Sequence, residues 1–244
     1  MSKPVAKRVT LDRLFSKLGL ASRGTAQKWI RAGRVRVNRL LTHDPDTWVN
    51  WPQEVVTLDD RPLHDTAKRF FLFHKPKGVI TTHSDEKQRK TIFDLLPTNI
   101  GFIHAVGRLD QHTSGLLLLT NDTELSSYLT APDNKFPRVY LATVKGEFSD
   151  AQRQQAIIGI VEQDDLLRCQ SIAIQKTSSR ESHLEVVLIE GKNREIRRLF
   201  NALGHEVTRL RRIRYGAFTL GDLQPGQWKE VAIDDARKAI ADLP

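Results

Sequence analysis

The chain has 244 residues, 39% of them hydrophobic and 27% charged, which suits one or two globular domains. Its single cysteine, Cys169, excludes an intramolecular disulfide and a cysteine-based zinc site, and no apolar run approaches the roughly 20 residues of a membrane span. The first 43 residues hold eleven Lys or Arg and one acidic residue, whereas the rest of the chain holds 27 and 28. The net charge of +9 is therefore localised, and it favours a polyanionic partner such as nucleic acid.

Two short helices and a strand are predicted near the amino-terminal end. Helical spacing is shown by Leu11, Leu14, Phe15 and Leu18. Thr10 is placed to cap this helix and Gly19 to end it, and Ser22 is placed to cap the next one. Alternation of Val35 and Val37 with polar residues then predicts a half-buried strand.

This stretch concentrates basic residues that have no acidic neighbours in the sequence, so we do not expect them to form an ion-paired face. They are Arg23, Lys28, Arg31, Arg34 and Arg36. The segment from Leu11 to Asn38, with its closing I-R-A-G-R-V-R-V-N, resembles the small RNA-binding domain first known from the fourth protein of the small ribosomal subunit. The resemblance implies that these five side chains bind structured RNA, in an α/β domain over residues 1–62.

A second domain is predicted after a polar linker at residues 63–69. Residues 70–244 alternate short apolar strands with helices, beginning with Phe70 to Phe73. This order predicts an α+β fold with flanking helices on a mixed, largely antiparallel sheet. The scattered histidines lack the spacing of a metal site, and neither a phosphate-binding loop nor a dinucleotide fingerprint is present.

The densest motif is GRLDQHTSGLLLLTND, from Gly107 to Asp122. Asp110 lies in a polar loop between two apolar stretches, and Gly107 and Gly115 give that loop the freedom to turn sharply. A carboxylate presented there has the chemistry of a nucleophile or a general base. Arg108 shares a face with Asp110 in an extended segment and is placed to pair with it.

The whole string resembles the signature of the RsuA family of pseudouridine synthases, which isomerise specific uridines in ribosomal RNA. The resemblance implies that Asp110 is the catalytic aspartate and that no cofactor or metal takes part. Lys75-Pro76-Lys77-Gly78 resembles the family's K-P-x-G segment, and Tyr140 matches the tyrosine that packs against the target base. Arg138 stands where the family often has lysine.

The segment EGKNREIRRLFNALGHEVTRLRRIRYG resembles the family's last motif, in which Arg197 would pair with the catalytic aspartate. The residues themselves predict an amphipathic helix around Leu199, ended by Gly204. In the basic strand that follows, alternation puts Arg212 and Arg214 on one face, as in a strand lining an RNA groove. Together the motifs predict a substrate site made of Arg108, Lys75, Arg194, Arg198 and Arg212.

The function predicted from these motifs is isomerisation of uridine in ribosomal RNA by a cytoplasmic monomer acting on free RNA or on an assembling subunit. The R-I-R-Y-G ending resembles that of the family's large-subunit enzymes, and this resemblance favours large-subunit over small-subunit RNA. Two hypotheses from other functional classes remain open at this point. One is a non-catalytic RNA-binding assembly factor, and the other is an RNA glycosidase, which would release uracil.

Overall fold

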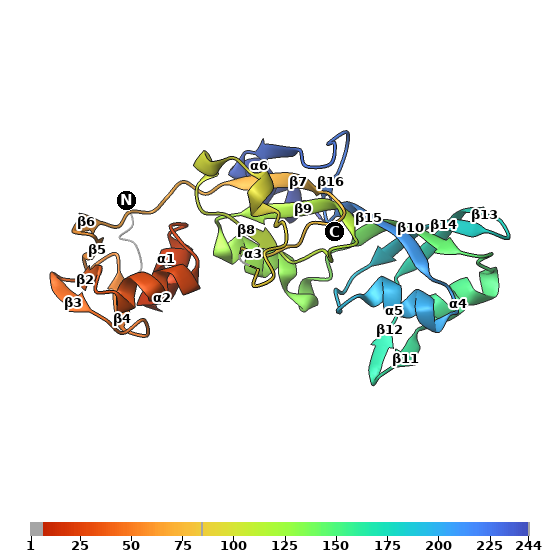
Figure 1. Cartoon of the computed structure of the whole chain (residues 1–244), viewed down its shortest axis with the longest axis horizontal. Helices are drawn as coiled ribbons and strands as arrows, with labels where there is room; N and C mark the ends of the chain where they lie inside the picture. Colours follow the sequence, from red (N-terminus) through yellow and green to blue (C-terminus); the bar gives the residue numbers. More distant parts are fainter. Residues whose placement is uncertain (1–6, 84, 244) are drawn as a thin grey trace. The chain divides into compact units, whose positions relative to one another are not determined.

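The computed structural model describes residues 7–83 and 85–243 (Figure 1), and the chain forms two compact units. The first unit contains Met1–Arg69, Thr98–His104 and Thr120–Leu125, and the second contains Phe70–Pro97, Ala105–Leu119 and Ser126–Pro244. Among the described residues, no helix combines the length and apolar character needed to cross a membrane.

The first unit packs two helices against short strands around a core that includes Phe15 and Ile30. Ser22 Oγ accepts a hydrogen bond from Thr25 N at 3.0 Å and caps the second helix, as predicted. Thr10 precedes the first helix without capping it, because its hydroxyl donates to the buried Asp12 carboxylate at 2.8 Å. The elements are β1 (Lys7–Thr10), α1 (Leu11–Lys17), α2 (Arg23–Arg31), β2 (Val35–Val37), β3 (Leu40–Thr42), β4 (Trp48–Trp51), β5 (Val56–Leu58) and β6 (Arg61–Pro62).

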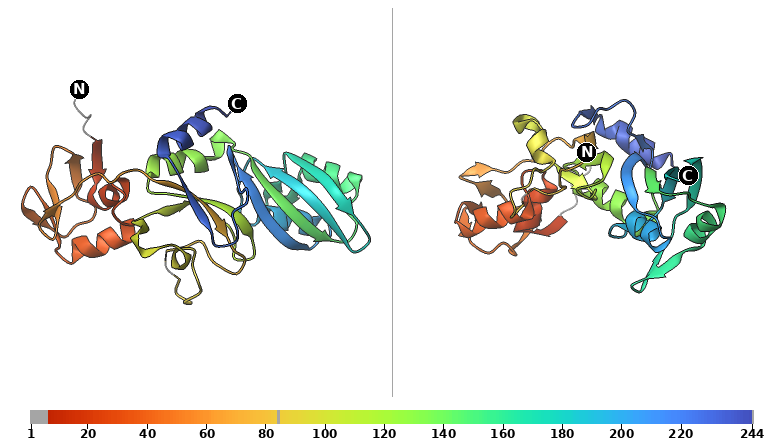
Figure 2. Two further views of the ribbon diagram at one scale, coloured as in Figure 1. Left: turned by 90° about the horizontal axis from the view of Figure 1, so that it is seen from above. Right: turned by 45° about the vertical axis from the view of Figure 1, so that its right-hand side comes forward.

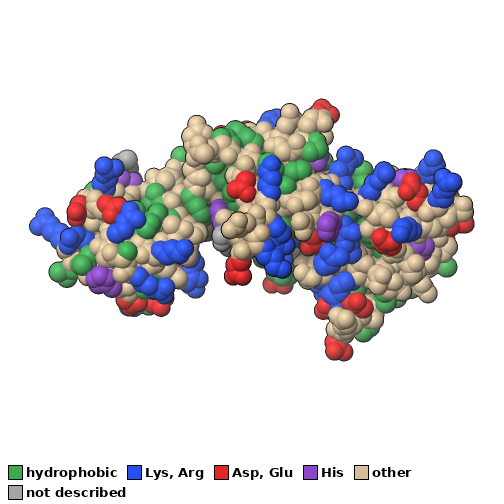
Figure 3. Space-filling view, viewed as in Figure 1, with side chains coloured by type: hydrophobic (Ala, Val, Ile, Leu, Met, Phe, Trp, Pro, Cys, Tyr) green, Lys and Arg blue, Asp and Glu red, His purple; other side chains and the backbone are tan. Residues whose placement is uncertain are grey.

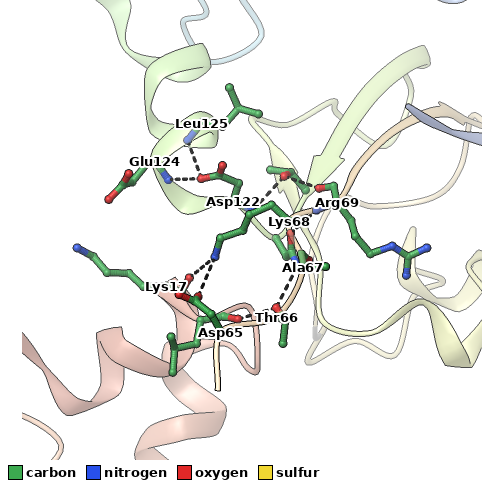
Figure 4. Close-up of polar contacts among 12 residues, drawn as sticks. Lys17, Asp65, Thr66, Ala67, Lys68, Arg69, Asp122, Glu124 and Leu125 are labelled. Carbon is green, nitrogen blue, oxygen red and sulfur yellow. Dashed lines mark hydrogen bonds and ion pairs between the residues drawn. The ribbon is translucent and has the colours of Figure 1, made fainter. Parts of the chain in front are cut away.

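Residues 63–69 belong to the first unit, where the T-N-D end of the central motif anchors them (Figure 4). Asn121 accepts a hydrogen bond from the Arg69 amide at 2.7 Å and donates one to the Ala67 carbonyl at 2.9 Å. The carboxylate of Asp122 accepts the first free amides of the helix that follows it. This part of the motif therefore has a structural explanation, independent of any chemistry at Asp110.

The second unit is built on one mixed sheet with the strand order β13-β14-β10-β15-β9-β7-β17, and β8 and β16 add to β9 and β15. The first four strands are antiparallel neighbours, whereas β9 runs parallel to β15. This confirms the predicted α+β class with a largely antiparallel sheet. The strands are β7 (Phe70–Lys75), β8 (His104–Val106), β9 (Ser114–Thr120), β10 (Arg138–Lys145), β13 (Ser171–Thr177), β14 (Glu181–Leu188), β15 (Val207–Tyr215), β16 (Phe218–Thr219) and β17 (Trp228–Val231).

Two helices cover one face of this sheet, and the other face is more open. Along β14 buried residues such as Leu184 and Val186 alternate with half-buried ones such as Glu185, which is typical of an antiparallel sheet packed on one side. Phe148, two residues before the helix that begins at Asp150, packs against Phe200 of the other helix, with ring centroids 5.2 Å apart. Figure 2 (left) shows the strands in front of these helices. The helices of the unit and one hairpin are α3 (Thr123–Thr130), α4 (Asp150–Ile158), α5 (Glu195–Ala202), α6 (Ile233–Ala241), β11 (Ile160–Glu162) and β12 (Asp165–Leu167).

Candidate active site

The loop that carries Asp110 connects β8 to β9 and is shaped by backbone contacts. Gly107 has φ +71° and Gly115 has φ +109°, a region that side chains disfavour, so the two glycines allow the sharp turns that the sequence predicted. Within the loop Thr113 N donates to the Asp110 carbonyl at 3.0 Å. The side chain of Asp110 is left partly exposed, at 28%.

Lys75 binds the backbone of this loop on its buried side. Its ammonium group is fully buried and donates to the carbonyls of Pro76, Asp110 and Thr113 at 3.1, 3.0 and 2.9 Å. Burial lowers the pKa of Lys75 to about 8, and the field of Asp110 opposes that change. The sequence predicted Lys75 as a substrate ligand, but the structure places it under the loop and not among the residues that line the cavity. Its three backbone bonds make it a positioning residue.

A cavity of about 450 Å³ opens beside Asp110 in the second unit. The Asp110 loop forms one wall, the segment before α5 forms another, and β10 and β15 form the floor. Figure 3 shows Lys and Arg side chains gathered on the face of the second unit turned toward the reader. The polar and aromatic residues that line the cavity include Arg108, Asp110, Arg138, Tyr140, Arg194, Glu195, Arg197, Arg212 and Tyr215.

Two arginines interact electrostatically with Asp110, and the nearer one is Arg194 and not the predicted Arg197. Arg194 Nη1 lies 3.7 Å from Asp110 Oδ2. Arg197, expected to make that pair, instead donates to the carbonyls of Val207 and His112 at 2.7 and 2.9 Å. Burial and the charge of Arg194 lower the pKa of Arg197, whereas Asp110 raises it, so the three charges share one field. Both guanidinium groups are therefore electrostatically attracted to this carboxylate.

The floor of the cavity stacks a buried guanidinium between aromatic rings. Arg212, only 2% exposed, donates from Nε to the Leu116 carbonyl at 2.8 Å and from Nη1 to the Tyr140 hydroxyl at 3.4 Å. Its Cζ lies 5.1 Å from the ring centroid of Tyr215, and Arg138 covers the same ring at 4.7 Å. Tyr140 is thereby fixed in the cavity beside the loop of Asp110.

A bulge in β15 separates Arg212 from Arg214, contrary to the prediction that they share a face. Tyr140 pairs with Arg212, whereas Val139 pairs with Arg214, so two residues of β10 oppose three of β15. The extra residue, Ile213, reverses the alternation beyond it. Arg212 therefore faces the cavity, and Arg214 lies with Arg211 on the other face of the sheet.

Arg108 is exposed and lines the cavity, and within the described part of the chain its side chain has no hydrogen-bond or ion-pair partner. Arg198, predicted as a substrate ligand, is not brought to the cavity. It bonds Glu162 at 2.5 Å and Asp165 at 2.8 Å in the β11–β12 hairpin. Because successive residues of a helix point about 100° apart, Arg197 and Arg198 serve different surfaces.

Glu195 is a cavity residue that the sequence analysis missed. Its side chain is 3% exposed, Oε2 accepts the Lys192 amide at 3.1 Å, and Oε1 has no partner among the described residues. Burial raises the pKa of Glu195 to about 7, and the charge of Glu190 adds to this effect. Glu195 lies four residues before Leu199 and therefore on the apolar face of the helix, and this spacing could have predicted that its carboxylate is buried.

We expect Glu195→Gln to stabilise the protein at alkaline pH and to change little at acid pH. Folding favours the protonated form, so the wild type loses stability as the pH rises from about 4.5 through about 7. Glutamine keeps an acceptor for the Lys192 amide and removes the buried charge. Urea unfolding should show a gain on the order of 2 kcal/mol at pH 8.5. Equal stability of the two proteins at that pH would contradict this prediction.

The basic residues of the first unit are more paired than the sequence predicted. Arg23 bonds Asp12, Arg34 bonds Asp59 and Arg36 bonds Asp60, at 2.7, 2.5 and 3.1 Å. These acidic partners lie 11, 25 and 24 residues away along the chain, so the expectation of unpaired basic residues is wrong for three of the five. Within the described residues, Lys28 and Arg31 remain without an ion-pair partner.

Neither the cysteine nor the metal-ligating residue types form a second site in the part of the chain that the structure describes. Cys169 is buried, and burial raises the pKa of its thiol to about 12, so it is a poor nucleophile. Across residues 7–83 and 85–243, no cluster of three His, Cys, Asp or Glu side chains is arranged to hold a metal ion.

Comparison with known proteins identifies the family. Residues 69–202 match the RNA pseudouridylate synthase family, and residues 9–41 match the S4 domain. An uncharacterized RNA pseudouridine synthase of Aquifex aeolicus is 35% identical over 91% of this chain and 90% of its own length. Ribosomal large subunit pseudouridine synthase B of Vibrio vulnificus is 34% identical over 92% of this chain and 72% of its own. A crystal structure of a pseudouridylate synthase superposes with a TM-score of 0.67 at 23% identity, covering 95% of this chain and 99% of that one. The chain therefore belongs to the RNA pseudouridylate synthase family and carries an S4 domain.

Proposed function

We propose that this enzyme isomerises a uridine of large-subunit ribosomal RNA, with Asp110 as the catalytic carboxylate. The observation that carries the proposal is the partly exposed Asp110 side chain at a cavity whose other walls supply Arg194, Arg197 and Tyr140. The likeness to a large-subunit enzyme of Vibrio vulnificus supports the choice of RNA.

The reaction breaks the bond between uracil N1 and ribose C1′ and forms a bond between C5 and C1′. The C5 proton leaves and N1 gains one, so substrate and product are isomers and the atoms balance without a co-reactant. Asp110 begins the reaction at the ribose, either by attacking C1′ or by removing the C2′ proton. Arg194 and Arg197 place positive charge beside its carboxylate for either route.

The uridine must leave its RNA stack to reach this cavity, at a free-energy cost of a few kcal/mol. Tyr140 supplies a ring on which the extruded base stacks, and Arg212 fixes that ring through its hydroxyl. Arg108 is free to contact the RNA backbone at the cavity mouth. Lys28 and Arg31 of the S4 domain extend RNA binding beyond the cavity, and a monomer in the cytoplasm suffices for these steps.

The test is release of tritium from RNA labelled at uridine C5, since that hydrogen must leave whenever pseudouridine forms. Purified enzyme is given separate unmodified transcripts of large- and small-subunit ribosomal RNA. We expect release from the large-subunit transcript, or from partly assembled large subunits if free RNA is folded wrongly. Release from the small-subunit RNA alone would overturn the choice of substrate, and free uracil in the products would indicate glycosidase chemistry.

A further inference from the structure

The sheet of the second unit has a basic face that the active site does not use. On β15 the exposed side chains of Arg209, Arg211 and Arg214 pair in register with Thr143, Leu141 and Val139 of β10. They therefore lie on the face opposite Tyr140 and Arg212. Lys176 of β13 continues the first of these rows across β14. We call these four cations and the strands beneath them the outer sheet face.

The outer sheet face is not covered by helices. In Figure 2 (left) the four strands β13, β14, β10 and β15 lie in front of α4 and α5, which pack behind them. Measured across the four strands, the face is three strand spacings wide, which is about 14 Å. Measured along β15, successive arginines of the face are about 7 Å apart. The cations thus cover a surface wide enough for several charged groups of one ligand.

These cations lack the acidic partners that basic residues have elsewhere in the unit. Arg153 bonds Asp150 at 3.0 Å and Lys145 bonds Glu206 at 2.5 Å. In the part of the chain that the structure describes, the four cations of the outer sheet face make no ion pair or hydrogen bond through their side chains. Glu185 is the acidic residue in their rows, and it does not bond them.

An unpaired row of like charges does not help the fold. Arginines two residues apart on a strand repel one another, and like charges on neighbouring positions destabilise a sheet. The bulge at Ile213 adds one more cation to the outer sheet face, because it turns Arg214 to the same side as Arg211. A stability role therefore leaves this arrangement unexplained, whereas an anionic ligand would neutralise it.

A groove of about 420 Å³ lies among these residues. Val139, Val187 and Leu220 give it an apolar floor. Its charged lining residues are Arg211, Arg214 and Glu185, so the two guanidinium groups outnumber the one carboxylate. Guanidinium groups bind phosphates through paired hydrogen bonds, and an apolar floor accepts the face of a ribose or a base. The groove has the chemistry of a nucleotide site within a longer strand.

We propose that the outer sheet face binds the backbone of the RNA substrate at a place remote from the modified uridine. The inference rests on the RNA substrate of the proposed function but not on the role of Asp110. RNA is the polyanion that this enzyme must hold, and a large folded RNA has segments that reach the face of the sheet away from the cavity. Direct phosphate contacts there add affinity without changing the chemical step.

The experiment compares Arg211→Glu/Arg214→Glu with Lys229→Glu/Lys238→Glu. The control reverses two exposed lysines of the same unit and changes the net charge equally. The affinity for a large-subunit ribosomal RNA transcript is measured as a function of KCl concentration. We expect the arginine variant to bind at least about tenfold more weakly at low salt, with a logarithmic salt slope smaller by about 1.5.

Two further measurements distinguish this proposal from its alternatives. The maximal rate of C5 tritium release at saturating RNA should match the wild type, because the cavity is untouched. The neutral variant Arg211→Gln/Arg214→Gln should lower the salt slope in the same way, which distinguishes lost contacts from added repulsion. RNA binding equal to that of the lysine control would overturn the proposal and point to an acidic protein partner. If wild type releases no tritium from any RNA, the proposed function fails, but the binding comparison still decides the role of this face.

Discussion

Asp110→Asn should abolish tritium release while leaving the fold and RNA affinity intact. Asparagine has the shape of aspartate but is neither a base nor an effective nucleophile, and loss of such a group lowers turnover by at least about a thousandfold. The loop should keep its conformation, because Lys75 and Thr113 bond the backbone carbonyl of residue 110 and not its side chain. Single-turnover tritium release and thermal unfolding measure the two effects.

Asp133→Asn is the matched control, since Asp133 is exposed in the same unit and does not line the cavity. It should keep wild-type turnover. If Asp110→Asn retained a tenth of the wild-type rate, Asp110 would not be the catalytic carboxylate. If its RNA affinity fell with its rate, the loss would reflect a damaged site.

Gly115→Ala should unfold or severely destabilise the protein. Gly115 pairs with Arg212 where β9 and β15 run parallel. A Cβ there would lie 2.2 Å from the Arg212 carbonyl oxygen and 2.6 Å from its nitrogen, so the two strands would have to separate. We expect a loss of more than about 3 kcal/mol of unfolding free energy, because backbone atoms cannot move aside as a flexible side chain can. Urea unfolding measures the loss, and tritium release should fall with it because the cavity floor includes Arg212.

Gly78→Ala isolates the part of this effect that comes from backbone conformation. Gly78 also has a positive φ, +93°, but nothing lies within 4 Å of the place a Cβ would take. Its alanine variant should lose only about 1–2 kcal/mol. Equal losses at the two glycines would show that strain, and not contact between strands, requires glycine at position 115.

Local patterns in the sequence predicted the elements well, and the central motif predicted which loop reaches the cavity. Alternation is complete in β14, and the amphipathic helix around Leu199 is present as α5. These features depend on neighbours a few residues away, which a sequence shows directly. The α+β class follows from the order of these elements along the chain and was confirmed, and so was the family resemblance, which rests on several motifs in their expected order.

Features that depend on distant partners could not be predicted. The bulge at Ile213 exists only in the pairing of β15 with β10, so the alternation of β15 alone gave Arg214 the wrong face. Lys75 bonds carbonyls far along the chain, and a motif cannot distinguish that role from substrate binding. Arg23, Arg34 and Arg36 were expected to be unpaired because their acidic partners are remote in the sequence.

Because β9 pairs with β15, the cavity beside Asp110 can form only after the later part of the chain has been synthesised. The Asp110 loop precedes β9, but its neighbour β15 and the wall around α5 are made much later. The core of the first unit, from Val9 to Leu63, needs none of these residues. Because domains fold as they emerge, the S4 domain is complete while the cavity is still half made. We therefore expect a nascent chain to bind RNA before it can modify it, and a chain terminated before α5 to bind RNA without catalysing the reaction.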